Sequence, residues 1–453
     1  MSPVDRAQAP APGPVRPMTF PRIRRDRLEN GLAVLTARHG DLPVVTVELV
    51  VDAGAAGDPA RKAGIAHLTV NGLEAGTRRR DADRIAWDLE SLGVELDAEA
   101  TWDAAAVRIT VPRERLEPAL ELFADLVRHP SFPEAEVLRM RDEQLATLLQ
   151  RRKEPRALAN DMAAHFIFAE EVPYARPLIG TTASVEGLDR DDVEAFYRAH
   201  YLPNAASLVF VGDIAAEDAR RLADRHFGDW SAGQTVTSEF EVIPGVETRT
   251  IFVVDRPGSV QSEIRIGDVG VARDDEDYFP LLVMNTILGG AFTSRLNLSL
   301  RERHGFTYGV RSGFAFRRRP GPFVVQTAVA TDVTARAVEE ALREMTELRE
   351  HGAAEPEVAA ARDYLRGILP LQLQTTDQLA TRIADLVIFD LPDEYFQEYR
   401  DRIAAVTAAD VHRVAREHLR LDRLAIVVVG DADQIAPALE ALAAGPVQIH
   451  RSI

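Results

Sequence analysis

The segment Leu208-Val209-Phe210-Val211-Gly212-Asp213 recurs later in the chain as Ile426-Val427-Val428-Val429-Gly430-Asp431. Each copy is an apolar run about as long as one buried strand. It ends at Gly-Asp, and a helical pattern precedes it. Asp192 and Asp410 begin the two helical patterns, and a His and a Gly follow both at the same spacing. The repeat therefore predicts a duplicated chain and not a short-period solenoid.

A second pair of segments supports the duplication. Glu136-Val137 is followed by Arg141-Asp142, and Glu357-Val358 is followed by Arg362-Asp363 at the same spacing. Two such matches in the same order are much harder to explain by chance than a single match. The chain is therefore expected to consist of two related halves.

The boundaries of the halves follow from composition. The segment Ser231–Val246 contains Gly, Ser, Thr and Pro residues typical of a link between folded units. The predicted N-terminal half is therefore residues 21–232, and the predicted C-terminal half is residues 247–453. Residues 1–20 are rich in Ala and Pro, which predicts a flexible tail.

Periodicity predicts strands grouped with helices in each half. The predicted strands are Gly31–Arg38, Val44–Asp52, Val94–Ala98, Ala105–Val111, Thr250–Asp255, Gln261–Gly267, Thr307–Phe316 and Phe323–Ala330. The predicted helices include Lys62–Leu73, Asp83–Leu92, Leu116–Arg128, Glu134–Arg152, Tyr278–Leu288 and Ser294–Arg303. This grouping indicates an α+β fold with an antiparallel sheet packed against α-helices in each half.

Composition limits the classes of function. The chain has 453 residues, 46% of them hydrophobic, and a net charge of −18. That charge argues against nucleic acid as a partner, because phosphates would be repelled. No apolar run has the roughly 18 residues of a membrane span, and the chain has no cysteine, so thiolate ligands are excluded. We expect a cytoplasmic protein that binds no membrane.

The stretch Gly64–Asn71 is close to the zinc-binding pattern H-x-x-E-H. The first His is His67, but Val70 occupies the Glu position and Asn71 occupies the position of the second His. Valine cannot accept a proton, so this helix lacks a general base. The pattern predicts a degenerate metal motif.

Several further segments resemble the pitrilysin/insulinase family of zinc peptidases, the inverzincins, and the resemblance covers nearly the whole chain. The matching segments include Asn30-Gly31-Leu32, Asp52-Ala53-Gly54-Ala55, Gly76-Thr77, Arg198–Asn204, Leu288–Leu296, Leu300-Arg301-Glu302 and Gly305–Tyr308. Family members that cleave peptides hold zinc with both motif histidines and a downstream Glu. A catalytic zinc needs three such protein ligands.

The resemblance places the downstream ligand near Ala146 or Thr147, and Glu143 lies about one helical turn too early. We therefore expect no metal on this chain, and we expect His67 to be a packed or hydrogen-bonded helix residue. Zinc would instead be bound by a homologous, active peptidase subunit with an intact motif.

The resemblance also implies a role for Arg301 and Tyr308, which match an Arg and a Tyr that reach the substrate near the scissile bond. A guanidinium and a phenol can hold a carbonyl oxygen and stabilise its developing charge. In some branches of the family, two chains enclose a chamber, and the chain without zinc contributes this pair. Peptides could also bind by adding to an exposed sheet edge.

Three hypotheses follow. The first is a non-catalytic, substrate-binding subunit of a heterodimeric zinc peptidase that cleaves peptides or unfolded polypeptides. The second is an inert binding or scaffold protein with the same fold. The third is a stand-alone enzyme with a rearranged metal site around His67.

Two other features receive structural interpretations. The basic runs Arg78–Arg80 and Arg317–Arg319 are interpreted as solvated faces. The pair Gly289-Gly290 lacks the Lys and Ser or Thr of a phosphate-binding loop. It is interpreted as a source of backbone mobility near the substrate path.

Overall fold

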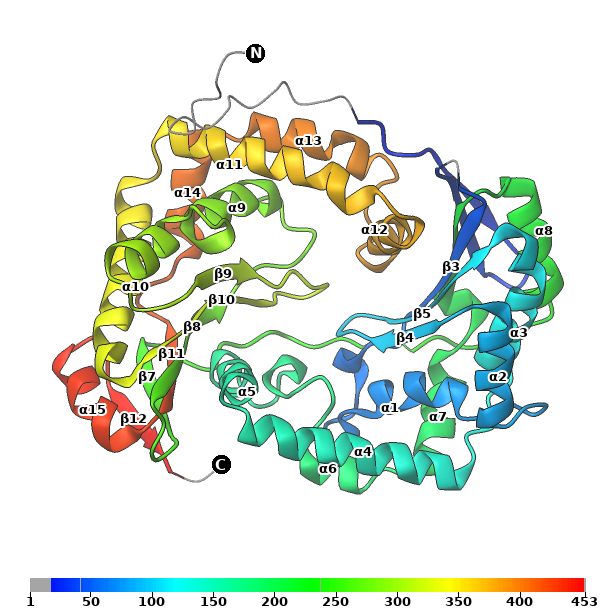
Figure 1. Cartoon of the computed structure of the whole chain (residues 1–453), viewed down its shortest axis with the longest axis horizontal. Helices are drawn as coiled ribbons and strands as arrows, with labels where there is room; N and C mark the ends of the chain where they lie inside the picture. The colour runs from blue at the N-terminus through cyan, green and yellow to red at the C-terminus, as the bar shows by residue number, and fades with distance from the viewer. Residues whose placement is uncertain (1–17, 41, 237, 452–453) are drawn as a thin grey trace, which may run out of the picture.

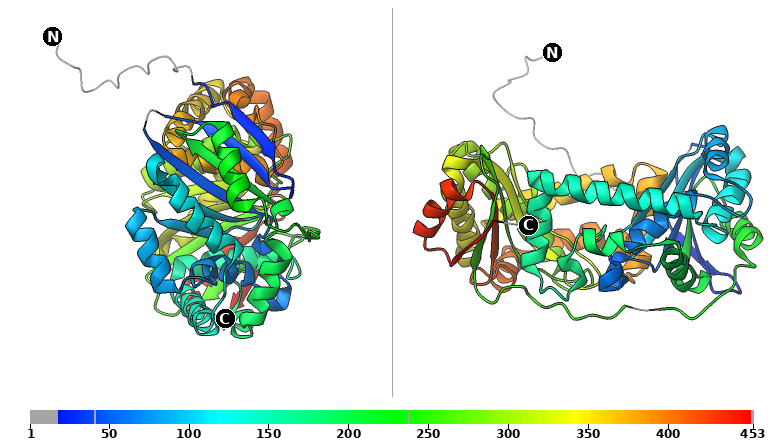
Figure 2. Two further views of the ribbon diagram at one scale, coloured as in Figure 1. Left: turned by 90° about the vertical axis from the view of Figure 1, so that its right-hand side faces the viewer. Right: turned by 90° about the horizontal axis from the view of Figure 1, so that it is seen from below.

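The computed structural model describes residues 18–40, 42–236 and 238–451, which form two halves lying side by side in an elongated molecule (Figures 1 and 2). Each half contains one six-stranded sheet. In sheet order, the N-terminal half has β1 (Ile23–Arg27), β2 (Ala33–Arg38), β6 (Ala206–Gly212), β3 (Val44–Val51), β5 (Ala105–Pro112) and β4 (Leu96–Ala100). The C-terminal half has β12 (Val447–His450), β7 (Thr250–Asp255), β11 (Ala425–Gly430), β8 (Gln261–Val269), β10 (Pro322–Ala330) and β9 (Val310–Phe314). The predicted α+β fold with two duplicated halves is confirmed.

Both sheets are mixed, so the expectation of purely antiparallel sheets needs a correction. Strand β2 runs parallel to β6, and β7 runs parallel to β11 and β12, whereas the other neighbouring strands are antiparallel. The parallel partners β2 and β6 are separated by most of the helices of their half. Long helical connections of this kind allow a strand to return in the parallel direction.

Helices cover the sheets. Those of the N-terminal half are α1 (Ile65–Asn71), α2 (Ala82–Leu92), α3 (Leu116–Arg128), α4 (Glu134–Lys153), α5 (Pro155–Ile167), α6 (Thr182–Glu186), α7 (Arg190–His200) and α8 (Ala216–Phe227). Those of the C-terminal half are α9 (Tyr278–Asn285), α10 (Thr334–His351), α11 (Glu355–Ile368), α12 (Thr376–Ile388), α13 (Tyr395–Ala405), α14 (Ala408–His418) and α15 (Ala432–Ala441).

The repeated segments form equivalent structures. Helix α7 begins at a capping box between Asp189 and Asp192, and α14 begins at one between Thr407 and Asp410. A capping box satisfies backbone N–H groups at the first turn, which fixes where each helix begins. Strands β6 and β11 then follow, and every residue of both is buried. The repeated Asp is thus a helix-start signal.

Three predicted elements are shorter or less regular than expected. Helix α1 begins only at Ile65, because Gly64 adopts a positive φ of 95°. The predicted helix at Ser294–Arg303 contains a π-helical turn at Asn297–Arg303. Strand β9 begins at Val310 because residues 304–309 form a loop.

One helix of each half packs on the sheet of the other half. Helix α5 of the N-terminal half packs on β8 and β11 of the other sheet, and α12 packs on β3 and β6 of the first sheet (Figure 1). On α5, Ala159 and Ile167 belong to one apolar cluster with Val427 and Val429. The halves predicted from the chain are therefore not independent packing units.

Contacts between the halves also involve segments predicted to be solvated or flexible. The Arg317 guanidinium lies over Tyr174, with 4.2 Å between the guanidinium carbon and the ring centroid, and Arg318 pairs with Asp52. In the other basic run, Arg80 pairs with the buried Asp125. The interpretation as solvated faces is therefore wrong for Arg317 and Arg80, which are partly buried against their partners, whereas Arg318 is exposed.

Most of the predicted tail lies outside the described residues, which begin at residue 18. Phe20 is buried, and its ring stacks on that of Phe396 with 5.1 Å between centroids. Phe20 also belongs to the same apolar cluster as β2 residues and helices of the C-terminal half. This residue therefore helps to join the halves.

The contact between α12 and β3 buries a carboxyl group. Glu48 is 3% exposed, its nearest cation is Arg108 at 4.0 Å, and burial raises the pKa of Glu48 to about 7. An unfolded Glu has a pKa of about 4.3, so the folded chain binds this proton more tightly. Folding stability contributed by Glu48 is therefore present below about pH 4.5 and is lost as the pH rises to about 7.

We predict that Glu48→Gln raises the free energy of unfolding by about 1–3 kcal/mol at pH 8 and leaves it unchanged at pH 4.5. Urea unfolding of the variant and the wild type at both pH values measures this difference. Asp58, whose pKa burial also raises to about 7, contributes equally to both proteins. An equal difference at the two pH values would contradict the prediction.

Candidate functional site

Helix α1 carries the degenerate motif, and its position is fixed from its N-terminus. The Asp58 carboxylate accepts hydrogen bonds from the backbone N–H of Gly64 at 2.7 Å and of Ala66 at 3.3 Å. A Cβ atom at Gly64 would lie 2.6 Å from the carbonyl oxygen of Ile179, so only glycine allows this approach. The start of α1 is thereby held against the rest of the half.

The three motif residues have different environments. Val70 is fully buried in the core, whereas His67 and Asn71 are partly buried. The Asn71 amide donates to the His67 carbonyl oxygen at 2.8 Å, and its nitrogen lies 3.2 Å from His67 Nε2. Burial lowers the pKa of His67, so its ring is neutral at pH 7. The expected packed and hydrogen-bonded histidine matches this geometry.

A cavity of about 440 Å³ lies between α1, α2 and α4. His67, Asn71, Glu143 and Thr147 line it, so the chain position expected for the downstream ligand does reach this cavity. The Thr147 hydroxyl donates to the Glu143 carbonyl oxygen at 2.9 Å. The Glu143 carboxylate is exposed and accepts from Arg139 at 2.6 Å.

Arg301 and Tyr308 lie on the C-terminal half. The Arg301 guanidinium lies over the Phe292 ring at 4.2 Å, and its Nη1 is 3.3 Å from Glu302 Oε1. Phe292 is 70% exposed, whereas the Arg301 side chain is 31% exposed and its Nη1 is buried without a hydrogen-bond partner among the described residues. Arg301 contacts Phe292 and Glu302 rather than Tyr308.

Tyr308 projects from the loop before β9 and is 98% exposed. Thr307 anchors the loop: its hydroxyl donates to the Gly309 carbonyl oxygen at 2.9 Å and accepts from Thr327 at 3.0 Å. The anchored loop leaves the phenol free to meet a ligand. Tyr308 also lines a cavity of about 570 Å³ on the open face of the second sheet.

Two features of the segment 289–292 were not anticipated from the sequence. Gly289 is a close-packing residue, because a Cβ there would lie 2.5 Å from Ser312 Oγ. Packing, rather than the expected mobility, therefore accounts for this glycine. Phe292 was not singled out, although an exposed aromatic residue directly after Gly-Gly-Ala was a usable signal.

Two family models match most of the chain. Residues 33–182 match the model described as "Insulinase (Peptidase family M16)", and residues 187–365 match the one described as "Peptidase M16 inactive domain". The chain belongs to the peptidase M16 family. The predicted resemblance to insulinase-type peptidases is therefore confirmed.

Relatives of this M16 chain include bacterial and plant proteins. It is 26% identical over 405 residues to an "Uncharacterized zinc protease" of Streptomyces coelicolor, with 88% of this chain and 87% of the relative covered. It is 27% identical over 435 residues to another from Mycobacterium tuberculosis, with 95% of each covered. It is 24% identical to a "Probable mitochondrial-processing peptidase subunit beta" of Arabidopsis thaliana, with 91% and 79% covered.

Solved M16 structures share the fold. A "peptidase M16 inactive domain" from Pseudomonas fluorescens has a TM-score of 0.84 and 26% identity, with 90% of this chain and 97% of that chain covered. A protease from Helicobacter pylori also has a TM-score of 0.84, at 19% identity, with 90% and 99% covered. A chain of Complex III2 from Candida albicans has a TM-score of 0.77 at 16% identity, with 94% and 100% covered. The last two likenesses indicate the fold alone.

The residues around His67 do not fit a zinc ion. Zinc in a catalytic site takes three protein ligands from His, Cys, Asp and Glu. Val70, Asn71 and Thr147 carry none of these groups, and Glu143 is paired with Arg139. Within residues 18–40, 42–236 and 238–451, the ligand atoms of three or more such side chains converge at only one place, and His67 is not part of it.

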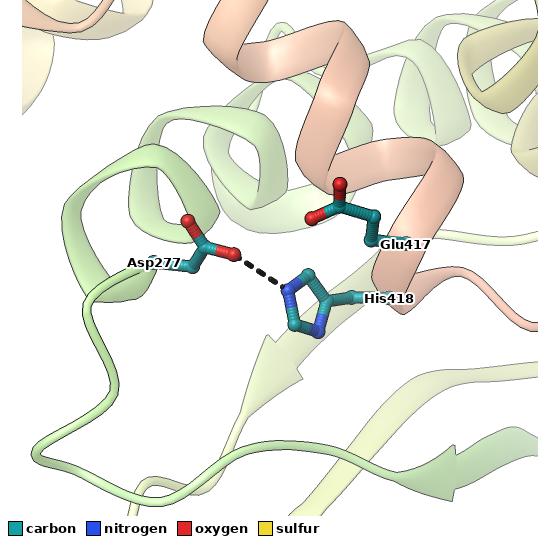
Figure 3. A group of neighbouring side chains, drawn as sticks. All are labelled: Asp277, Glu417 and His418. Atoms are coloured by element: carbon teal, nitrogen blue, oxygen red, sulfur yellow. Dashed lines mark hydrogen bonds and ion pairs between the residues drawn. The ribbon is translucent and has the colours of Figure 1, made fainter.

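That one place is Asp277, Glu417 and His418, where α9 meets α14 (Figure 3). The Asp277 carboxylate already accepts from His418 Nε2 at 2.9 Å and from Arg413 Nη1 at 3.0 Å. A guanidinium on this carboxylate supplies the positive charge that a metal would bring. The cluster is therefore an ion-pair network that joins two helices, and it lowers the pKa of Asp277 through the Arg413 hydrogen bond.

No helix in the described part of the chain is long and apolar enough to span a bilayer.

Proposed function

We propose that this M16 chain is the non-catalytic, substrate-binding subunit of a two-chain zinc peptidase that cleaves peptides or unfolded polypeptides. The observation that carries the proposal is the contrast between two sites. The α1 cavity has lost its metal ligands, with Val70 and Asn71 in their places, whereas Tyr308 is exposed and Arg301 is partly exposed. A chain that kept only the second site would need a homologous partner to supply zinc.

The chemistry proposed for this chain is electrostatic. The Arg301 guanidinium is held over Phe292, and Tyr308 stands clear of the surface on an anchored loop. Placed beside a substrate carbonyl in the partner's site, the two groups would donate hydrogen bonds to its oxygen as negative charge develops there. Zinc and the general base would come from the partner. We place the two-chain enzyme in the cytoplasm, in keeping with a chain that has no cysteine.

The test is co-expression with a chromosomally neighbouring M16 chain that has an intact H-x-x-E-H, followed by gel filtration and a quenched-peptide assay. We expect a stable complex, cleavage by the pair only, and zinc that copurifies with the partner. Cleavage by this chain alone with bound zinc would favour the stand-alone enzyme. A metal-free, inert chain that forms no complex would favour the scaffold hypothesis, and either result would overturn the proposal.

A further inference from the structure

The C-terminal sheet has one face that is only half covered. Helix α5 packs over its apolar part, on β8 and β11 (Figure 1). The uncovered part lies over β8, β10 and β9 and is polar. A cavity of about 570 Å³ stands on it, lined among others by Arg156, Glu263, Arg265, Tyr308 and Arg311. We call this cavity the arginine pocket.

The floor of the arginine pocket is a buried cation held in one place. Arg265 is 2% exposed, and its guanidinium donates to Asn160 Oδ1 at 2.7 Å and to Glu263 Oε2 at 2.9 Å. It also donates to the backbone oxygens of Ile264 and Arg156. Glu263 is the one carboxylate that this guanidinium hydrogen-bonds among the described residues, so the base of the pocket is rigid and has little negative charge of its own.

The rim of the pocket adds positive charge with no ion-pair partner. Arg156, on the first turn of α5, and Arg311, on the edge strand β9, are exposed, and neither side chain pairs with a carboxylate among the described residues. Three arginines therefore face one glutamate in a chain with a net charge of −18. A local charge opposite to that of the whole chain indicates a preference for an anionic ligand.

The duplicated half shows that this charge is not a consequence of the fold. The register of the strands makes Glu48 the counterpart of Arg265, and Asp97 the counterpart of Arg311. The equivalent cavity of about 540 Å³ is lined by Glu95, Asp97 and Asp377 with Arg108 as its cation. The two halves thus carry opposite charge at equivalent places.

We propose that the arginine pocket binds a carboxylate group of a peptide, with Arg311 and Arg156 as its charged donors. This inference rests on the proposed function for the presence of a peptide, and it names the chemistry that the substrate-binding subunit selects. The carboxylate belongs either to a peptide C-terminus or to an Asp or Glu side chain. An arginine presents paired N–H groups that match a carboxylate in both cases.

The test measures fluorescence anisotropy of three labelled hexapeptides of Gly, Ser and Ala with the full chain alone. One ends in a free carboxylate, one in an amide, and one has an amide end and a single internal Asp. We expect at least one carboxylate peptide to bind about 10-fold or more tightly than the neutral amide. Which of the two binds identifies the source of the carboxylate.

Variants assign the binding to the pocket. Arg311→Gln and Arg156→Gln are each expected to weaken carboxylate binding about 3- to 10-fold and to leave the amide peptide unchanged. Arg220→Gln removes an exposed arginine on α8, outside the pocket, and should change neither. All three lie at the surface, so thermal unfolding should be unaltered.

Equal binding of all three peptides, no measurable binding of any, or equal effects of Arg311→Gln and Arg220→Gln would overturn the inference. The assay needs no partner chain. If the binding assay shows no preference for a carboxylate, the cleavage assay of the two-chain complex still tests the proposed function. If that complex does not cleave peptides, the binding assay still tests this inference.

Discussion

Arg301→Ala in the two-chain complex is expected to lower kcat/KM for peptide cleavage by about 10²- to 10³-fold without dissociating the subunits. A preorganised donor to a developing oxyanion contributes an effect of about this size in other enzymes. Here the guanidinium is already oriented by the Phe292 ring, so little reorganisation is needed as charge develops. A quenched-peptide assay on the gel-filtered pair measures the loss.

The matched control is Arg303→Ala, which removes an exposed arginine from the same π-helical segment. Its activity should stay within about 2-fold of the wild type, because surface substitutions away from a site have small effects. Loss of activity in both variants to the same degree would point to disruption of the segment. Full activity of Arg301→Ala would remove Arg301 from the reaction altogether.

The fold was largely predictable because the duplicated signals are local. The apolar runs of β6 and β11 end at Gly-Asp, and the Asp192 and Asp410 capping boxes begin the helices before them. Such signals depend on neighbouring residues, so the sequence order alone displays them. They locate elements within a half but contain no information on how the two halves meet.

The contacts between halves could not be read in this way. Nothing local distinguishes α5, which packs on the distant sheet, from helices that cover their own sheet. For the same reason Arg317 looked like part of a solvated basic run, although its ring partners Trp102 and Tyr174 lie far away in the chain. Long-range packing decided both cases.

In the candidate site, too, local sequence signals were predictable and long-range contacts were not. The positions of His67, Val70 and Asn71 follow from one motif, because helical spacing places residues four apart on one face. Thr147, one of the two positions that the resemblance gave for the downstream ligand, lines the cavity together with Glu143. The arginine pocket was missed, since Arg265 and Arg311 are brought together only by the pairing of β8 and β9 with β10.

A double variant, Asn71→His with Thr147→Glu, is expected to give this chain a zinc site with a Kd below about 1 µM, at least about 100-fold tighter than the wild type. The two substituted side chains and His67 would supply three ligands from the walls of one cavity. Burial already lowers the pKa of His67, so its ring is neutral at pH 7 and free to bind metal. Zinc content after dialysis and competition with a chelator measure the affinity.

The matched control, Asn71→Gln with Thr147→Gln, adds comparable bulk and no ligand, so it should bind no more zinc than the wild type. Val70 is kept in both variants because it is fully buried, and a carboxylate there would be costly to bury. The zinc-loaded double variant should therefore still fail to cleave peptides, since Val70 keeps the position of the motif's general base. Zinc binding without hydrolysis would separate loss of the metal from loss of the base. Failure of the double variant to bind zinc would show that the backbone of α1 and α4, and not only the ligand set, has moved away from a metal site.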